Sequence, residues 1–280
     1  MDDKAAIAGG TDPSEREGAA RSGAARARRT PRRVEIGIDN GTQMSLDVLF
    51  FGAHPDDVEW GAGGMALQLA AQGCSFGIVD LTDGEMGSRG TPVERKEEAS
   101  QASLFIGAAA RESLHMPDCG ITDSPEQRCM VASVLRRYRP KIVIAPYWED
   151  RHPDHAAAGK TIRHAALYAT LRKLADENPP HKPPIFLYYL LHGVERPCFV
   201  VDISHVFEKK LELLKIHRSQ FSKTAEEFGV LPLGLGDYLF ALESRDRFFG
   251  SLAGVHFGEA LVIDQPLKLN SLAQLLPLAQ

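Results

Sequence analysis

The chain has 280 residues, of which 44% are hydrophobic and 25% charged, with a net charge of −5 and a pI near 6.1. A chain of this length can bury a substantial core. Its acidic balance offers no basic face for nucleic acid, and no apolar run is long enough to span a bilayer. The scattered cysteines, Cys74, Cys119, Cys129 and Cys198, contain no C-x-x-C pair. We therefore expect buried free thiols in a cytoplasmic protein with no membrane or nucleic-acid partner.

Residues 1–43 differ from the rest of the chain. They are rich in Ala, Gly and Arg, and no acidic residue lies between Gly18 and Val34. No apolar stretch follows the arginines, which argues against a secretory signal. A nucleic-acid arm is one alternative, but we favour a disordered or misassigned N-terminal extension. Residues 44–280 are then a single domain, and we expect a protein that starts at Met44 to keep full activity and its metal.

From residue 46 onward, expected strands and helices alternate, as they do in a doubly wound sheet. The glycines in 61–64 do not form G-x-G-x-x-G, so dinucleotide binding is a poor interpretation. We predict an α/β, Rossmann-like, mostly parallel sheet with helices on both faces and a crevice at the carboxyl ends of the strands. The expected strands are 46–51, 76–81, 114–115, 141–145, 185–191, 199–203 and 254–263, and the expected helices are 61–73, one opened by Pro92, 125–138, 155–173, 204–220 (with Ser204 as N-cap) and 237–249.

One imidazole and two carboxylates follow the first expected strand. His54, Asp56 and Asp57 lie where a buried apolar run ends and a helix begins, which is where open α/β sheets bind ligands. His54 and Asp57 are three residues apart in a tight turn, close enough to hold one cation, and Asp56 stands beside them. The alternative is a helix N-cap, in which Asp56 or Asp57 accepts backbone N–H bonds.

A second polar cluster follows the expected strand 141–145. It contains His152, Asp154 and His155, and its histidines are again three residues apart. Two such clusters on parallel strands would face each other across the crevice. Two histidines and one carboxylate form a frequent catalytic zinc set that leaves a position for water. A cysteine-free N/O site suits zinc best, with Fe²⁺ or Mn²⁺ possible.

The sequence around both clusters resembles the signature motifs of the PIG-L/LmbE-like zinc-dependent N-acetylglucosamine deacetylases. These motifs are Ala-His-Pro-Asp-Asp-Val-Glu at 53–59 and His-Pro-Asp-His at 152–155. Four further segments are similar to the bacillithiol-pathway branch, which removes acetate from N-acetylglucosaminyl-malate. They are Arg95-Lys96-Glu97-Glu98-Ala99, Met116-Pro117-Asp118, Ala145-Pro146-Tyr147 and Ser219-Gln220-Phe221.

The resemblance implies one zinc ion per chain, held by His54, Asp57 and His155. The chemistry suits such an ion, because an amide is a poor electrophile and water a poor nucleophile. A cation that lowers the pKa of bound water to about 7 and polarises the carbonyl addresses both problems.

The resemblance also implies three catalytic residues. Asp56 would take the proton from the attacking water and pass it to the leaving amine. His152 would stabilise the tetrahedral oxyanion, a role worth roughly 3–4 kcal/mol for one donor. Asp154 is a candidate to orient His152, and its alternative is a helix N-cap ahead of His155.

Three residues are candidates for substrate contacts. Arg95 lies in the family's helix motif and could form a bidentate bond to a hydroxyl or carboxylate, with a surface ion pair to a nearby Glu as the alternative. Arg89 on the glycine-rich loop is a second candidate, for malate, and Tyr238 stands where the family places a late tyrosine. Trp60 and Trp148 flank the two motifs, and we favour core packing for both.

The sequence therefore predicts a metal-dependent hydrolase that acts on a small-molecule N-acetylglucosaminide, with the malate conjugate as the expected substrate. One alternative is a sister amidase that cleaves thiol-sugar S-conjugates, and another is a deacetylase of a different N-acetylglucosamine conjugate. A non-catalytic zinc- or sugar-binding protein is less favoured, because such a site would need neither Asp56 nor His152. The resemblance further implies a homo-oligomer, a hexamer in some members.

Overall fold

The computed structural model describes residues 44–193, 196–221 and 238–279, so the expectations about residues 1–43 lie outside it. Seven strands form one sheet in the order β3-β2-β1-β4-β5-β7-β6. The first five run parallel, and β7 is antiparallel to both of its neighbours. The strands are β1 (Val48–Gly52), β2 (Phe76–Thr82), β3 (Ala110–Met116), β4 (Ile142–Pro146), β5 (Ile185–Tyr189), β6 (Phe199–Asp202) and β7 (Gly258–Val262).

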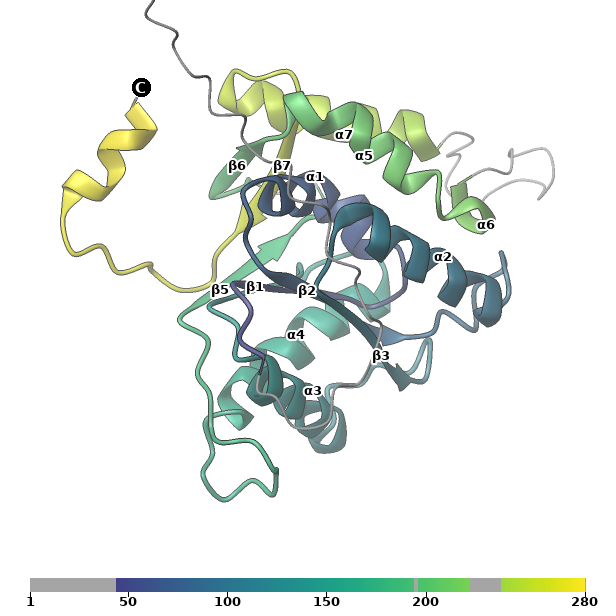
Figure 1. Ribbon diagram of the computed structural model, residues 1–280, viewed down its shortest axis with the longest axis vertical. Helices are drawn as coiled ribbons and strands as arrows, with labels where there is room; N and C mark the ends of the chain where they lie inside the picture. Colours follow the sequence, from purple (N-terminus) through teal and green to yellow (C-terminus); the bar gives the residue numbers. More distant parts are fainter. Residues whose placement is uncertain (1–43, 194–195, 222–237, 280) are drawn as a thin grey trace, which may run out of the picture. The chain divides into compact units, whose positions relative to one another are not determined.

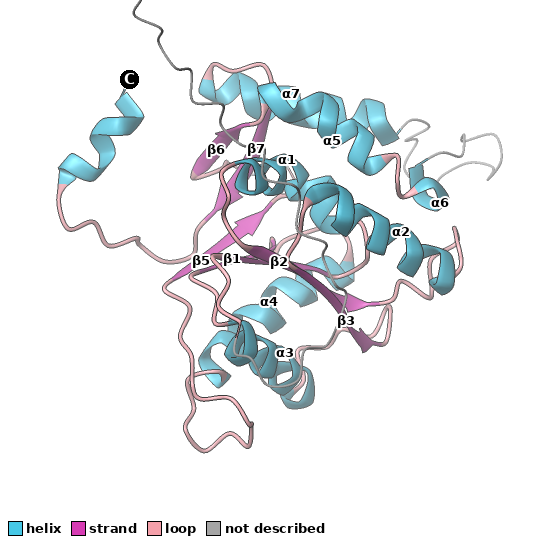
Figure 2. Ribbon diagram, viewed as in Figure 1, coloured by secondary structure: helices cyan, strands magenta, loops and turns pink. Residues whose placement is uncertain are grey.

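Helices cover both faces of the sheet. Figure 1 and Figure 2 show α3 and α4 on one face, and α1, α2, α5 and α7 on the other. The predicted mostly parallel α/β fold is thus confirmed. The helices are α1 (Asp57–Ala71), α2 (Pro92–Ile106), α3 (Pro125–Tyr138), α4 (Pro153–Tyr168), α5 (Phe207–Leu214), α6 (Arg218–Phe221) and α7 (Tyr238–Ala253), with 3₁₀ turns at η1 (Ser204–Val206) and η3 (Leu272–Ala279).

Strand β1 lies at the centre of the fold. All of its residues are buried, and they alternate between the two cores, with Phe50 in one core and Phe51 in the other. From β1 the chain moves outward to β2 and β3, then returns to β4 on the opposite side. Such a reversal opens a crevice at the carboxyl ends of the two strands beside it. The segments that follow β1 and β4 both enter this crevice.

Glycines let α1 pack closely on the sheet. A Cβ atom on Gly61 would lie 2.2 Å from the Tyr189 ring, and one on Gly64 would lie 2.7 Å from Ile203. The Tyr189 hydroxyl passes beneath the helix and donates a hydrogen bond to the Phe51 carbonyl at 2.9 Å. The glycine-rich part of α1 therefore serves helix–sheet packing.

A charged cluster is buried between α5, α7 and β7. The Lys210 ammonium lies 2.7 Å from an Asp246 oxygen and 2.6 Å from a Glu259 oxygen. None of these three side chains is exposed. Buried charges of this kind are tolerated only when they are paired and hydrogen-bonded.

The same cluster holds α1 at its middle. The Glu259 carboxylate accepts hydrogen bonds from the backbone N–H groups of Gly64 and Met65, both at 2.7 Å. On the preceding turn, the Arg245 guanidinium donates to the Trp60 carbonyl at 2.6 Å and to Asp246 at 2.8 Å. Four charged side chains from α5, α7 and β7 thus fix the helix that begins at the crevice.

The expected helix 204–220 is wrong as a single element. The chain forms η1, α5 and α6 instead, and Ser204 does not cap a helix, because its hydroxyl accepts a hydrogen bond from the Phe257 backbone N–H at 3.1 Å. The break allows His217 to turn inward, where its ring lies 3.3 Å from the Glu59 carboxylate and is fully buried. Burial of this histidine against α1 overrides the helical periodicity.

Other boundaries differ less. Helix α1 begins at Asp57 rather than at residue 61, α4 ends at Tyr168 rather than at residue 173, and β3 is a full strand. The prediction of buried thiols is wrong for Cys119 and Cys198, which are exposed. Within the described ranges, no helix combines the length and the apolar character needed to cross a bilayer.

Candidate active site

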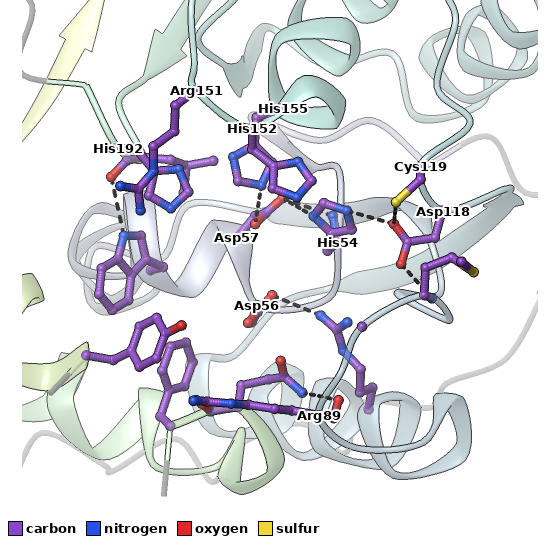
Figure 3. Close-up of a pocket in the computed structure, with 18 residues that line it drawn as sticks. His54, Asp56, Asp57, Arg89, Asp118, Cys119, Arg151, His152, His155 and His192 are labelled. Atoms are coloured by element: carbon purple, nitrogen blue, oxygen red, sulfur yellow. Dashed lines mark hydrogen bonds and ion pairs between the residues drawn. The ribbon is translucent and has the colours of Figure 1, made fainter. Parts of the chain in front are cut away.

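A pocket of about 310 Å³ opens at the carboxyl edge of the sheet (Figure 3). The segments after β1, β2, β3, β4 and β5 line it, together with α6 and the start of α7. Its lining residues are His54, Asp56, Asp57, Trp60, Met86, Gly87, Arg89, Arg95, Asp118, Cys119, Arg151, His152, His155, Leu191, His192, Gln220, Phe221 and Tyr238.

The turn after β1 presents both of its aspartates to the pocket. The backbone of Asp56 has φ 136°, a conformation that side-chain-bearing residues rarely adopt and that is often found at functional sites. The Asp56 carboxylate does not cap α1. The Asp57 carboxylate accepts N–H bonds from Ala53 at 2.8 Å and His54 at 2.9 Å, which precede the helix. The alternative of a carboxylate N-cap is therefore wrong.

The three predicted metal ligands lie together. Ligand atoms of His54, Asp57 and His155 lie within 4.8 Å of one another, and all three residues are buried. One Asp57 oxygen is 3.2 Å from His155 Nε2, and the other is 3.5 Å from His54 Nδ1. His155 Nδ1 is hydrogen-bonded to Asp150 at 3.1 Å, which leaves Nε2 facing the site. Histidines that bind metals are typically held this way by a carboxylate, so the donor set fits a divalent cation.

Buried acids also favour positive charge at this point. Burial lowers the pKa of His54, but hydrogen bonds to Asp118, Asp154 and Asp57 outweigh it and raise this pKa well above the usual range. Burial likewise opposes protonation of His155, yet the charge of Asp57 and the hydrogen bonds to Asp150 and Asp57 raise its pKa to about 9. The raised pKa values favour protonated rings in the absence of a metal, and a bound cation would take the place of those protons.

Arg95 forms an ion pair with Asp56. Its guanidinium donates to the Asp56 carboxylate at 3.2 Å, to the Pro55 carbonyl at 3.2 Å and to the Gly84 carbonyl at 3.0 Å. Gly84, at φ 68°, leaves room for it, since a Cβ there would lie 2.0 Å from the Arg95 side chain. Burial raises the pKa of Asp56 and the Arg95 charge opposes this rise. Arg95 is only 4% exposed, so the alternative of a surface ion pair is wrong.

His152 is the N-cap of α4. Its Nδ1 accepts the Asp154 backbone N–H at 3.3 Å, so the neutral ring carries its proton on Nε2. The Asp154 carboxylate accepts the Cys119 N–H at 2.7 Å and lies 3.4 Å from His54 Nε2. The alternative of Asp154 as the cap is wrong, and its contact with His152 runs through the backbone.

Three acidic or imidazole side chains in or directly behind the pocket wall received no role from the sequence. Asp118, after β3, lies 3.1 Å from His54 Nε2. Asp150, after β4, accepts hydrogen bonds from His155, from the His152 backbone at 2.8 Å and from His192. Asp118 belongs to the Met116-Pro117-Asp118 motif noted in the sequence. His192 belongs to none of the motifs noted there, so no sequence signal identified it.

The outer wall of the pocket is aromatic. The Trp60 and Phe221 rings stack with centroids 5.6 Å apart, and Tyr238 packs edge-on against both. Arg89 lies 5.1 Å from the Tyr238 ring and donates to the Gln220 carbonyl at 2.9 Å. Both predicted contacts, Arg89 and Tyr238, thus line the pocket. Trp60 lines the pocket as well, and both Trp60 and Trp148 pack, partly buried, against the hydrophobic cores as expected.

Known proteins resemble this chain in sequence. A family model described as PIG-L, GlcNAc-PI de-N-acetylase, matches residues 49–166. The diacetylchitobiose deacetylase of Thermococcus kodakarensis is 32% identical over 232 residues, which cover 76% of this chain and 81% of that protein. The chain belongs to the PIG-L family.

Further relatives agree with this assignment. A Bacillus cereus protein, named as a probable N-acetyl-alpha-D-glucosaminyl L-malate deacetylase 2, is 29% identical over 197 residues, covering 66% of this chain and 88% of that one. A conserved protein of Thermus thermophilus has a similar structure, with a TM-score of 0.72, 39% identity and coverage of 80% of this chain and 97% of that one. The predicted family and fold are confirmed. The PIG-L family is one of metal-dependent deacetylases, hydrolases of amide bonds, and the donor set described above fits that chemistry.

Proposed function

We propose that this PIG-L protein is a zinc-dependent hydrolase that removes the acetyl group from a small N-acetylglucosaminide. The observation that carries the proposal is the position of Asp56 and His152. They flank the buried His54, Asp57 and His155 set in one pocket. A site that only bound metal would need neither flanking side chain.

The reaction consumes one water molecule and gives acetate and a free amine. A divalent cation held by His54, Asp57 and His155 would lower the pKa of water and polarise the amide carbonyl. Asp56 accepts a proton from the attacking water as the new C–O bond forms. Desolvation of this half-buried carboxyl raises its pKa, which brings it closer to the working range of a general base.

His152 acts on the opposite side of the amide carbon. Its Nε2–H donates to the oxygen that becomes negatively charged in the tetrahedral intermediate. Asp56 then delivers its proton to the amide nitrogen, the C–N bond breaks, and the amine leaves. Asp154 supports this arrangement, because its carboxylate accepts the Cys119 N–H and lies beside His54 Nε2. Its backbone N–H donates to His152 Nδ1 and so orients the His152 ring.

The substrate that we favour is N-acetylglucosaminyl-malate. Two arginines, Arg89 and Arg151, line the pocket outside the acidic site, and guanidinium groups bind carboxylates strongly. Arg95 is a less direct contact, because its guanidinium is already bonded to Asp56 and two carbonyls. Zinc, rather than Fe²⁺ or Mn²⁺, suits the nitrogen and oxygen donors.

A second candidate is another N-acetylglucosamine conjugate whose aglycone is itself a sugar or a thiol adduct. The aromatic wall of Trp60, Phe221 and Tyr238 favours it, because flat rings pack well against the apolar faces of such groups. The similarity to a diacetylchitobiose deacetylase supports the same candidate.

The test is acetate and amine release by zinc-loaded protein from a panel of substrates. The panel contains N-acetylglucosaminyl-malate, N,N′-diacetylchitobiose and a thiol-sugar S-conjugate. We expect turnover of at least one, and fastest turnover of the malate conjugate. Release from none, with zinc bound and the fold intact, would overturn the deacetylase proposal, and preference for the disaccharide would overturn only the malate assignment.

The matched variants are Asp56→Asn and His205→Asn. The first keeps the shape of the carboxyl but removes the base, so we expect a 10²- to 10⁴-fold loss of kcat with unchanged zinc content. The second alters an exposed histidine outside the pocket and should leave turnover unchanged. Equal activity of the two variants would exclude Asp56 as the base.

A further inference from the structure

His192 places a further imidazole beside the site. It follows β5, the strand next to β4, and it lines the same pocket as His152 and His155 (Figure 3). The His192 and His155 rings stack almost in parallel, with centroids 5.2 Å apart and planes at 5°. The chemistry described above gives His192 no part.

Asp150 fixes the orientation of His192. One Asp150 oxygen lies 3.0 Å from His192 Nδ1, and the other accepts the His192 backbone N–H at 3.1 Å. The first oxygen also receives His155 Nδ1 at 3.1 Å and the His152 N–H at 2.8 Å. An ionised carboxylate only accepts hydrogen bonds, so His192 must donate from Nδ1.

This donation determines what His192 offers to a ligand. A neutral imidazole that donates from Nδ1 has an acceptor lone pair at Nε2. The side chain of His192 is 25% exposed, and its residue lines the pocket, so Nε2 is the polar ring atom available to a ligand. The arginines that line the same pocket can only donate.

We propose that His192 binds the sugar of the substrate, accepting a hydrogen bond at Nε2 from a pyranose hydroxyl, with Asp150 as the positioning residue that sets its tautomer. This inference rests on the proposed N-acetylglucosaminide substrate and assigns one of its hydroxyl contacts. Asp150 then serves two rings at once, because the same oxygen orients His155 toward the metal position and His192 toward the sugar.

A role for His192 in metal binding is the competing interpretation. Ligand atoms of Asp150, His155 and His192 also lie within 4.8 Å of one another. The hydrogen bonds argue against it, because both Nδ1 atoms face the same carboxylate oxygen while His155 Nε2 faces Asp57 at 3.2 Å. Loss of zinc in a His192 variant is therefore an outcome that would overturn the proposal.

Two substitutions separate the two ring nitrogens. In His192→Asn the side-chain amide nitrogen can take the place of Nδ1, so the bond to Asp150 is kept and the Nε2 acceptor is lost. In His192→Gln the side-chain oxygen can take the place of Nε2, so the acceptor is kept and the bond to Asp150 is lost. Comparison of the two shows which nitrogen matters.

The readout is the Kd of methyl N-acetylglucosaminide, measured by NMR titration of zinc-loaded protein. Asp56→Ala is present in every background to prevent turnover. We expect His192→Asn to bind the sugar about tenfold more weakly, the loss of one hydrogen bond, with unchanged zinc content. His192→Gln should remain within about threefold of the parent. Unchanged binding in the Asn variant with weakened binding in the Gln variant would overturn the proposal, because His192 would then matter only through Asp150.

Deoxy sugars identify the hydroxyl. The 3-, 4- and 6-deoxy forms of the same glycoside should each be titrated against the parent and His192→Asn. One of them should lose about tenfold in the parent and nothing in the variant, and equal losses in both proteins for all three sugars would refute the contact. This comparison measures binding, so it is judged separately from acetate release. A protein that binds the sugar through His192 but releases no acetate would contradict only the proposed function.

Discussion

Replacement of Lys210 by methionine gives a quantitative test of the charged cluster beneath α1. The ammonium lies 2.7 Å from Asp246 and 2.6 Å from Glu259, and no part of the three side chains is exposed. Asp246 keeps Arg245 at 2.8 Å after the substitution. Glu259 keeps only the N–H groups of α1 and becomes a buried carboxylate without a cation.

Removal of one partner from such a pair typically costs about 3–5 kcal/mol, because the remaining charge stays buried. A protein of this size loses about 2–4 °C of Tm per kcal/mol, so we expect Tm to fall by about 6–20 °C. The measurement is urea and thermal unfolding at neutral pH. The control is Lys209→Met, an exposed neighbour on the same helix, which should stay within about 0.5 kcal/mol of the parent.

The pH dependence of this loss is also fixed by the structure. Burial raises the pKa of Glu259 above its unfolded value, and Lys210 opposes that rise. Without Lys210 the pKa of Glu259 in the folded protein rises further. The destabilisation caused by the ionised carboxylate is therefore full above this folded-state pKa, and it disappears as the pH falls toward the pKa of Glu259 in the unfolded chain. The difference between Lys210→Met and the parent should therefore be smaller at pH 5 than at pH 8.

A double variant isolates the cause. Glu259→Gln in the Lys210→Met background removes the unpaired charge but keeps an oxygen for the α1 N–H groups. We expect it to recover part of the lost free energy of unfolding. Two results would show that an uncompensated charge is not the reason for the destabilisation. One is that Lys210→Met is as stable as Lys209→Met. The other is that the stability losses caused by Lys210→Met and by Glu259→Gln simply add in the double variant.

Three further predictions concern the site. Arg95→Met should raise the pKa of Asp56, because in the parent protein the guanidinium opposes the effect of burial on that pKa. The acidic limb of the kcat/KM profile should therefore move to higher pH. A limb that does not move would contradict the pairing of Arg95 with Asp56. Zinc binding at pH 7.5 should release protons, because the pKa values of His54 and His155 are raised in the metal-free protein. Calorimetry in buffers of different ionisation enthalpy counts the released protons. A binding enthalpy that does not depend on the buffer would be inconsistent with protonated rings. Asp150→Asn should weaken zinc binding by about 10–100-fold, the usual effect of removing a carboxylate behind a histidine ligand, whereas competition titration that gives an unchanged Kd would show that this contact is dispensable.

The proximity of the three proposed metal ligands was predictable because these residues lie close to strand ends. His54 and Asp57 follow β1 and His155 follows β4, and parallel neighbouring strands bring their carboxyl ends to the same edge of the sheet. Short loops leave these side chains little freedom to point elsewhere. A motif next to a buried apolar strand therefore contains most of the information about the position of such a site.

The supporting residues were not predictable in this way. His192 lies in the segment after β5, and only its tertiary contacts with Asp150 place it beside the site. Arg95 lies on α2 and was expected to contact substrate, with a surface ion pair as the alternative. The Gly84 turn instead lets its guanidinium reach Asp56. These contacts depend on tertiary placement of loops, and no spacing along the chain specifies them.

The break between α5 and α6 has the same origin. The residues 204–220 have a helical pattern, but His217 is buried beside Glu59, and the chain turns to allow it. A pattern of apolar positions indicates which residues are buried, not whether one continuous helix buries them.

The long-range support of α1 limits how far this protein can be shortened. The family model spans residues 49–166, which contain the proposed metal ligands and the two proposed catalytic residues beside them. Yet Glu259 and Arg245, which bind the backbone of α1, lie about eighty to ninety positions beyond that segment along the chain. A fragment cut at residue 166 would keep the proposed site residues but would leave α1 without these backbone contacts. Gene fusions, split reporters and minimal enzymes made from this chain should therefore retain the sequence through β7.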